Sequence, residues 1–165
     1  MRLIGAALLT AAGLLAGLSA ADGMRRRADR RSELVRMLAW MEFELSRFST
    51  PMPALFERLA EQLTGEAAAL CRRVCEGLRS LGSRTLADIW GAALEQLPPA
   101  ERQILLPLGQ VLGRYGTREQ LMALSACRNA MERARDEAQT ALRERGRMTV
   151  GVSAAGAAAL AVLLL

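Results

Sequence analysis

Two stretches at the ends of the chain, residues 3–21 and 149–165, contain no charged side chain, and this constrains the fold more than any other feature. A membrane-spanning helix needs about 20 mainly apolar residues, so the first stretch is long enough and the second is marginal. Arginines crowd the inner ends of both stretches, at Arg25, Arg26, Arg27, Arg30 and Arg31 and at Arg143, Arg145 and Arg147. Because positive charge accumulates on the cytoplasmic side, we predict two transmembrane helices, both termini outside, and a cytoplasmic domain over residues 22–148.

A cleaved signal peptide is the alternative for the first stretch, because Ser19 and Ala21 fit a small-x-small cleavage site. A signal peptide carries its positive charge mainly before the apolar run, whereas here the arginines follow it. Such charges resist translocation of the chain that comes next. We therefore favour a retained membrane anchor.

The composition of the middle segment favours helices. The chain has only two Trp, one Tyr and three Phe, its β-branched residues are few, and Ala, Leu, Arg and Glu are abundant. These residues prefer helices to strands. The prediction is an all-α protein, a cytoplasmic helical bundle of about six helices flanked by N- and C-terminal transmembrane helices.

The longest predicted helix runs from Thr117 to Leu165 and begins with a capping box, in which Gln120 reaches back to the Thr117 amide. Apolar residues spaced three and four apart place one stripe on this helix, comprising Leu121, Leu124, Cys127, Met131, Ala134, Ala138 and Leu142. A second long helix over residues 32–49 carries a comparable stripe of Leu34, Leu38, Met41, Leu45 and Phe48. We predict that these two helices pack along each other.

Prolines and glycines divide the rest of the middle segment into shorter helices. Helix breaks are predicted at Pro51 and Pro53, at Gly65, at Gly82, and at Pro98 and Pro99. Thr85 and Asp88 have the spacing of a second capping box. Pro107 interrupts an apolar face and predicts a kink there, and Gly116 is expected to take a left-handed conformation before the last helix.

Two pairs of side chains allow alternative interpretations. Trp40 and Phe43 share a face of the 32–49 helix with Arg36 and Arg47, and we favour burial in the bundle core over an exposed docking strip. Cys71 and Cys75 share a helical face, which suits a metal or redox pair. Apolar packing is favoured, because no His is present to complete a zinc site.

The absence of His and of known catalytic motifs argues against an enzyme. We expect no catalytic residue, no cofactor and no metal. Thirteen arginines and fourteen acidic residues lie between Ser32 and Leu142, so the folded segment is nearly neutral. A nucleic-acid groove needs basic residues interleaved with aromatic ones on the folded body, so we expect no nucleic acid. The arginine clusters at the ends suit anionic membrane lipids instead.

One run before the last helix contains two Leu-Gly steps four residues apart, Leu108-Gly109 and Leu112-Gly113, followed by the capping residue Thr117 and by Gln120. This run resembles the signature of the stage III sporulation protein AB family. Three further features fit, namely Leu3-Ile4-Gly5, the run 50–55, and Gly151 in the terminal apolar run. One departure is Thr117 where Asp is expected, which preserves capping but removes a charge from the helix N-terminus.

The resemblance implies a membrane scaffold of the channel-like complex between mother cell and forespore in endospore formation. Its fold would be similar to the cytoplasmic domains of the type II secretion platform protein F. Implied partners are a secretion-type ATPase, other membrane components of the channel and membrane lipids, on the mother-cell side of the cell membrane; a homo-oligomer is compatible with this role. The alternative is a platform component of a pilus or secretion machine.

Candidate residues for partner binding are Arg114, Tyr115, Arg118 and Glu119, at the turn expected to lie farthest from the membrane. A cytoplasmic motor could reach this turn. A solvated loop is an equally compatible interpretation of the same residues.

Overall fold

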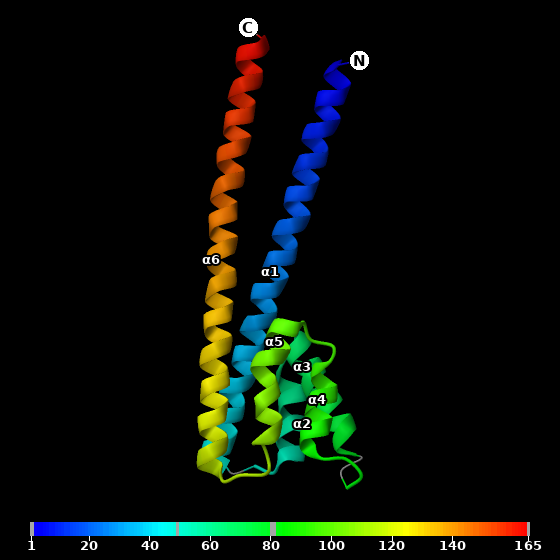
Figure 1. Cartoon of the computed structure of the whole chain (residues 1–165), viewed down its shortest axis with the longest axis vertical. Helices are drawn as coiled ribbons and strands as arrows, with labels where there is room; N and C mark the ends of the chain where they lie inside the picture. The colour runs from blue at the N-terminus through cyan, green and yellow to red at the C-terminus, as the bar shows by residue number, and fades with distance from the viewer. Residues whose placement is uncertain (1, 49, 80–81, 165) are drawn as a thin grey trace. The chain divides into compact units, whose positions relative to one another are not determined.

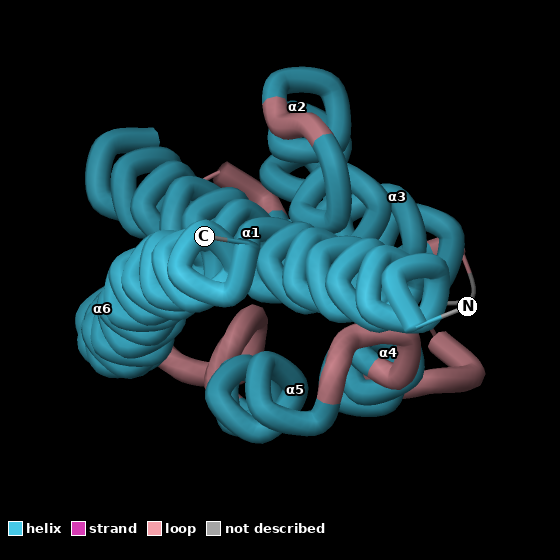
Figure 2. Tube along the Cα trace, turned by 90° about the horizontal axis from the view of Figure 1, so that it is seen from above, coloured by secondary structure: helices cyan, strands magenta, loops and turns pink. Residues whose placement is uncertain are grey.

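The structure, a computed structural model, describes the backbone of residues 2–48, 50–79 and 82–164 and the side chains of residues 22–48, 50–79 and 82–144. Helices and loops make up the described chain, which contains no strand (Figures 1 and 2). The elements are α1 (Arg2–Phe48), α2 (Met52–Gln62), α3 (Gly65–Leu78), α4 (Leu86–Leu94), α5 (Pro99–Leu105), the 3₁₀ helix η1 (Leu106–Gln110) and α6 (Thr117–Leu164). The all-α prediction is confirmed.

The chain forms two compact units. One consists of the outer parts of the two long helices, Met1–Ala28 and Asp136–Leu165, and the other is Asp29–Arg135. In the part whose side chains are described, no helix is long and apolar enough to span a membrane. The two predicted spans, 3–21 and 149–165, lie outside those residues.

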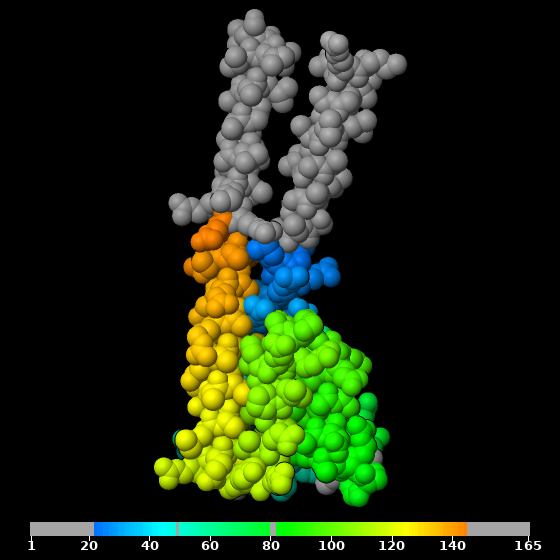
Figure 3. Space-filling view, viewed as in Figure 1, coloured from blue at the N-terminus to red at the C-terminus, as the bar shows by residue number. Residues whose placement is uncertain are grey.

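The second unit is built around the inner parts of α1 and α6, which run antiparallel. Arg31 of α1 donates to the Ala134 carbonyl of α6 over 2.6 Å, and Glu42, farther along α1, pairs with Arg128, which is earlier in α6. The surface of α6 meets that of α5 without a gap (Figure 3). There the Cys127 thiol donates to the Ile104 carbonyl over 3.2 Å. The predicted pairing of the two long helices is confirmed.

The apolar stripes of the long helices face a core shared with α2 to α5 and η1. Leu34, Leu38, Met41 and Leu45 are buried, as are Leu124, Cys127 and Met131. Phe56 of α2 and Trp90 of α4 meet in the core with ring centroids 5.9 Å apart. Phe48, predicted to complete the α1 stripe, is 62% exposed, because α1 ends there and its ring extends beyond the packed face.

The helix boundaries follow the predicted breaks. Pro51 precedes α2, Pro98 precedes α5, and Gly65 begins α3 with a φ of +60°. The predicted capping box at α4 is formed, with the Asp88 amide donating to the Thr85 hydroxyl over 3.2 Å and the Thr85 amide donating to the Asp88 carboxylate over 3.0 Å. Pro107 lies in η1, where the helix tightens after α5, so the predicted interruption is confirmed.

Two local predictions are wrong. Trp40 and Phe43 are 40% and 48% exposed, because the core side of α1 is already occupied by its leucine and methionine stripe. The left-handed glycine before α6 is Gly113, with a φ of +70°, and not Gly116. Gly116 directly precedes α6, and its carbonyl accepts the Gln120 amide over 3.1 Å as the first turn of the helix forms.

Charged side chains fix how α1 lies against its neighbours. Arg31 pairs with the buried Glu101 of α5 over 2.8 Å. Glu44, also buried, accepts hydrogen bonds from Thr50 and from Arg58. Buried charges are tolerated only when they are paired and hydrogen-bonded, so these contacts specify one arrangement of the helices.

Candidate functional site

The two Leu-Gly pairs, 108–109 and 112–113, lie in the chain directly before the candidate partner-binding residues. Leu108 and Leu112 are buried in the core, one from η1 and one just after it. Gly109 lies against Trp90, since a Cβ at this position would stand 2.8 Å from the Trp90 Cδ1 atom. The Trp90 ring is itself held by a hydrogen bond from Nε1 to the Leu105 carbonyl over 2.9 Å. The first glycine therefore permits a close approach of backbone and ring.

Gly113 and Gln120 shape the turn itself. Gly113 reverses the chain in the left-handed region, which glycine adopts without strain. The buried side chain of Gln120 then braces the turn from inside, because its amide nitrogen donates to the Tyr115 carbonyl over 2.7 Å and its oxygen accepts the Gly113 amide over 3.4 Å. These bonds satisfy backbone groups at two points of the turn.

The predicted capping box of Thr117 and Gln120 at the start of α6 is not formed. The hydrogen bonds of the Gln120 side chain run to Gly113 and Tyr115, and not back to the Thr117 amide. The prediction that Thr117 caps α6 is also wrong: Thr117 is the first helical residue, and the Gln120 amide donates to the Gly116 carbonyl over 3.1 Å.

All four predicted partner-binding residues are exposed. Tyr115 is 54% exposed, and Arg114, Arg118 and Glu119 belong to the same class. The Glu119 carboxylate folds back over Gly116, 2.7 Å from where a Cβ would stand, and its charge lies in the first turn of α6. An acidic side chain is favourable there because the helix N-terminus carries partial positive charge. Within residues 22–48, 50–79 and 82–144, no carboxylate pairs with Arg114 or Arg118.

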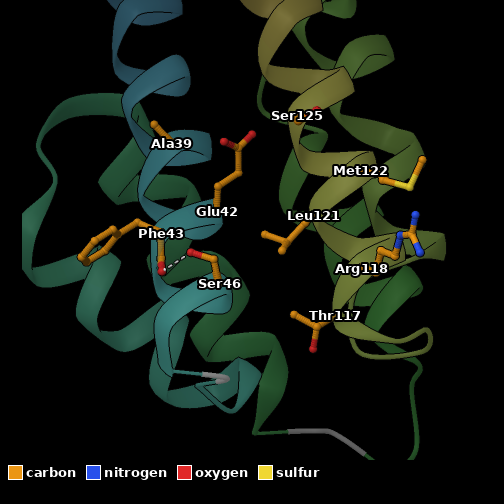
Figure 4. A pocket seen from close by; sticks show the side chains of 9 residues that line it. All are labelled: Ala39, Glu42, Phe43, Ser46, Thr117, Arg118, Leu121, Met122 and Ser125. Carbon is orange, nitrogen blue, oxygen red and sulfur yellow. Dashed lines mark hydrogen bonds between the residues drawn. The ribbon is translucent and has the colours of Figure 1, made fainter.

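An open groove of about 840 Å³ lies between α1 and α6, next to this turn (Figure 4). Side chains of Glu42 and Leu121 extend between the two helices, whereas the ring of Phe43 lies at the outer edge of α1. The lining residues are Ala39, Glu42, Phe43 and Ser46 from α1 and Thr117, Arg118, Leu121, Met122 and Ser125 from α6. Of the predicted residues, Thr117 and Arg118 therefore line the groove, and Arg114, Tyr115 and Glu119 do not.

An aromatic strip continues the α1 edge of the groove. The ring of Phe43 meets Trp40 at 6.3 Å and Phe48 at 6.1 Å between centroids, both in edge-to-face geometry. The Arg47 guanidinium lies 5.9 Å from the centre of the Phe43 ring, within the range of a cation–π interaction. We call Trp40, Phe43 and Phe48 the aromatic strip.

Sequence reasoning missed most of the groove. The sequence pattern places Leu121 in the core stripe. Its side chain is half-buried, because it packs against the core and also lines the groove. Met122, 65% exposed, follows that stripe by one residue and gives no periodic signal. The available signal was Phe43 with Trp40, two large apolar residues off the core stripe of their helix.

The three cysteines are free thiols with raised pKa values. Burial and the neighbouring Cys75 raise the pKa of the Cys71 thiol to about 12, and burial likewise raises those of Cys75 and Cys127. A thiol is reactive as its thiolate, so these groups stay protonated and poorly nucleophilic at neutral pH. Cys71 is fully buried among apolar side chains, as the packing interpretation predicts. Among the described residues, no three His, Cys, Asp or Glu side chains form a group able to hold a metal.

Comparison with known proteins agrees with this arrangement of helices. A solved structure described as stage III sporulation protein AB superimposes with a TM-score of 0.64 at 20% identity, over 72% of this chain and 97% of that one. At this identity the likeness shows the fold. No curated protein sequence matches the chain. The family description "stage III sporulation protein AB" matches residues 2–165. Since that match covers almost the whole sequence, the chain belongs to the stage III sporulation protein AB family.

Proposed function

We propose that this protein is a membrane-anchored structural component of the complex that joins mother cell and forespore during endospore formation. The observation that carries the proposal is the family match over residues 2–165. The sporulation role follows from the family, and the channel role is the finer step proposed here. A scaffold role suits a helical unit in which buried charges fix the helix positions and whose thiols stay protonated. We propose no enzymatic activity and no cofactor.

In this proposal the ends of the chain are two membrane spans, residues 3–21 and 149–165. The uncharged sequence of both stretches and the arginines beside them support this placement. The domain then faces the mother-cell cytoplasm, with both termini outside. The flanking arginines would contact anionic lipid headgroups, each contributing about 1 kcal/mol near such a surface.

The turn before α6 is the proposed contact for a secretion-type ATPase. Support comes from its exposed arginines, Arg114 and Arg118, which no described carboxylate neutralises, and from the exposed ring of Tyr115. Arg and Tyr are enriched at the centres of protein interfaces. The Gln120 brace holds the backbone of this turn, so partner binding need not order it first.

Deletion of the gene in its host tests the role. Heat-resistant spores would be counted after deletion, and again after restoring either the full chain or residues 22–148 alone. The proposal expects a block after engulfment that only the full chain repairs. Normal spore counts without the gene would refute it and would favour a component of a pilus or secretion machine.

Charge reversal tests the ATPase contact. The variant Arg114→Glu with Arg118→Glu should reduce capture of the ATPase by the full chain at least tenfold, since both contacts become repulsive. Arg72→Glu with Arg79→Glu is the matched control, because these exposed residues of α3 and its C-cap give the same change in net charge. Equal capture of the ATPase by both variants would refute a contact at this turn.

A further inference from the structure

The helix α1 has two apolar faces within the Asp29–Arg135 unit, and only one of them is covered. Leu38, Met41 and Leu45 are buried against the core. Phe43 and Trp40 lie on another face and remain about half exposed, at 48% and 40%. An exposed cluster of large apolar side chains, rimmed by polar ones, is typical of a protein interaction site.

The groove beside this face has a shape that can accommodate one more helix. Its two walls are antiparallel helices; the side chains of Glu42 and Leu121 extend between them, and Phe43 and Met122 lie at its opposite edges (Figure 4). The lining runs from Ala39 to Ser46 on α1 and from Thr117 to Ser125 on α6. At 1.5 Å per residue these segments span roughly 10–12 Å, which is about two turns of a helix.

The charges around the groove identify the chemistry of the occupant. The one acidic lining residue, Glu42, is already neutralised by Arg128, whose Nε atom lies 3.1 and 3.2 Å from its two carboxylate oxygens. Arg118 lines the groove and Arg47 lies over the Phe43 ring. Neither has a carboxylate partner within the described residues 22–48, 50–79 and 82–144. A complementary surface is therefore apolar where it meets Leu121, Phe43 and Met122, and acidic where it meets Arg47 and Arg118.

We propose that this groove binds an amphipathic helix of a partner protein, with its apolar face on Phe43, Leu121 and Met122 and with flanking carboxylates on Arg47 and Arg118. A helix laid into an apolar groove, with anchors at i, i+3, i+4 and i+7, is a common recognition mode. A second copy of this groove is disfavoured as occupant, because it would bring the same uncompensated arginines together. The inference does not depend on the sporulation role or on ATPase capture.

The two tryptophans provide a direct assay. Trp90 is fully buried, whereas Trp40 is exposed and touches Phe43, so quenching of tryptophan emission by acrylamide reports Trp40. The full chain, held in nanodiscs of zwitterionic lipid, would be titrated with a Trp-free helical peptide. That peptide carries Leu at i, i+3, i+4 and i+7 and Glu beside them; the control peptide carries Lys in place of Glu. The Glu peptide should lower the quenching constant at least twofold, and the Lys peptide should leave it unchanged.

Variants at Phe43 and Arg47 separate the groove from the turn, because Arg118 belongs to both surfaces. Phe43→Ser should weaken binding of the Glu peptide at least tenfold. Arg47→Glu should do the same and should gain affinity for the Lys peptide. Leu106→Ser and Arg72→Glu are the matched controls, since both residues are exposed and lie outside the groove, and they should bind as the parent does.

Four outcomes would overturn the proposal. They are equal binding of both peptides, no protection of Trp40 by the Glu peptide, protection by vesicles of anionic lipid without peptide, and protection that rises with the concentration of the chain alone. The third would assign the face to a membrane and the fourth to a second copy. Each of these results leaves the ATPase capture experiment unaffected.

Discussion

Gly109 offers the sharpest test of how the Leu-Gly motif works. A Cβ at this position would stand 2.8 Å from Cδ1 and 3.3 Å from both Cβ and Cγ of Trp90. Real Cβ contacts are longer, so either the ring or the backbone of η1 has to move. The ring is fully buried and its Nε1 atom donates to the Leu105 carbonyl over 2.9 Å, which leaves it little freedom. The substitution Gly109→Ala should therefore disturb the packing of α4 against η1.

The expected loss of stability follows from three effects. Overpacking a core costs about 1–3 kcal/mol, and loss of the Trp90 hydrogen bond costs about 1 kcal/mol more. Alanine offsets about 0.4–1 kcal/mol of this by restricting the unfolded chain. The net loss is about 1–3.6 kcal/mol, which lowers the melting temperature of a domain of this size by about 5–20 °C.

Gly91→Ala is the matched control, because Gly91 lies inside α4 and nothing stands within 4 Å of a Cβ there. Replacing a helical glycine with alanine in open space should raise stability by about 0.5–1 kcal/mol. Melting of the full chain followed by tryptophan emission compares the two variants directly, since Trp90 reports the affected contact. If Gly109→Ala melts at or above the parent temperature, the close approach to Trp90 does not explain the motif.

Three further substitutions test contacts outside Gly109. Gln120→Ala should lower stability by about 1–3 kcal/mol, because it removes the brace of the turn; an unchanged urea midpoint would contradict this. Hydrogen bonds from Thr85 lower the pKa of Asp88 below its ordinary 3.8, so their contribution is present above that value and is lost as pH falls through the lowered pKa. Thr85→Ala should accordingly lose more stability at neutral pH than in acid, and an equal loss at every pH would refute the linkage. Arg31→Met leaves the 2% exposed Glu101 unpaired and should lower the free energy of unfolding by about 3 kcal/mol. Adding Glu101→Leu should restore part of this stability, because no unpaired charge is then buried. A double variant that is less stable than Arg31→Met alone would be inconsistent with this.

The helical architecture was readable from the sequence because local signals agreed with tertiary packing. Proline and glycine positions marked the breaks, and the Thr85 capping box formed as its spacing indicates. Apolar residues at intervals of three and four identified the buried faces of the long helices. The end of α1 was less readable, since Phe48 continues the pattern in sequence although the neighbouring helices no longer cover it.

The candidate site was readable only in part, because its groove lies between two helices that are far apart in sequence. Exposure of Arg114 and Tyr115 followed from their place in a turn. Placing Phe43 and Met122 on opposite rims requires the lateral position of α1 against α6, which the Glu42 pair with Arg128 helps to set. That position has no local sequence signal. The identity of the left-handed glycine failed for a similar reason, since both Gly113 and Gly116 precede α6 and only the brace from Gln120 distinguishes them.

Within the run 108–120, the residues that carry the family resemblance are those that build the turn, and this separates folding from recognition at the proposed partner-binding site. Leu108 and Leu112 are buried, Gly109 and Gly113 meet steric and backbone requirements, and Gln120 lies inside the turn. A partner cannot contact side chains that are buried. In the proposed contact, specificity therefore resides in the exposed candidate residues that the motif leaves unassigned, Arg114, Tyr115, Arg118 and Glu119. Because their side chains make no contact on which the turn depends, they can change the partner without changing the fold.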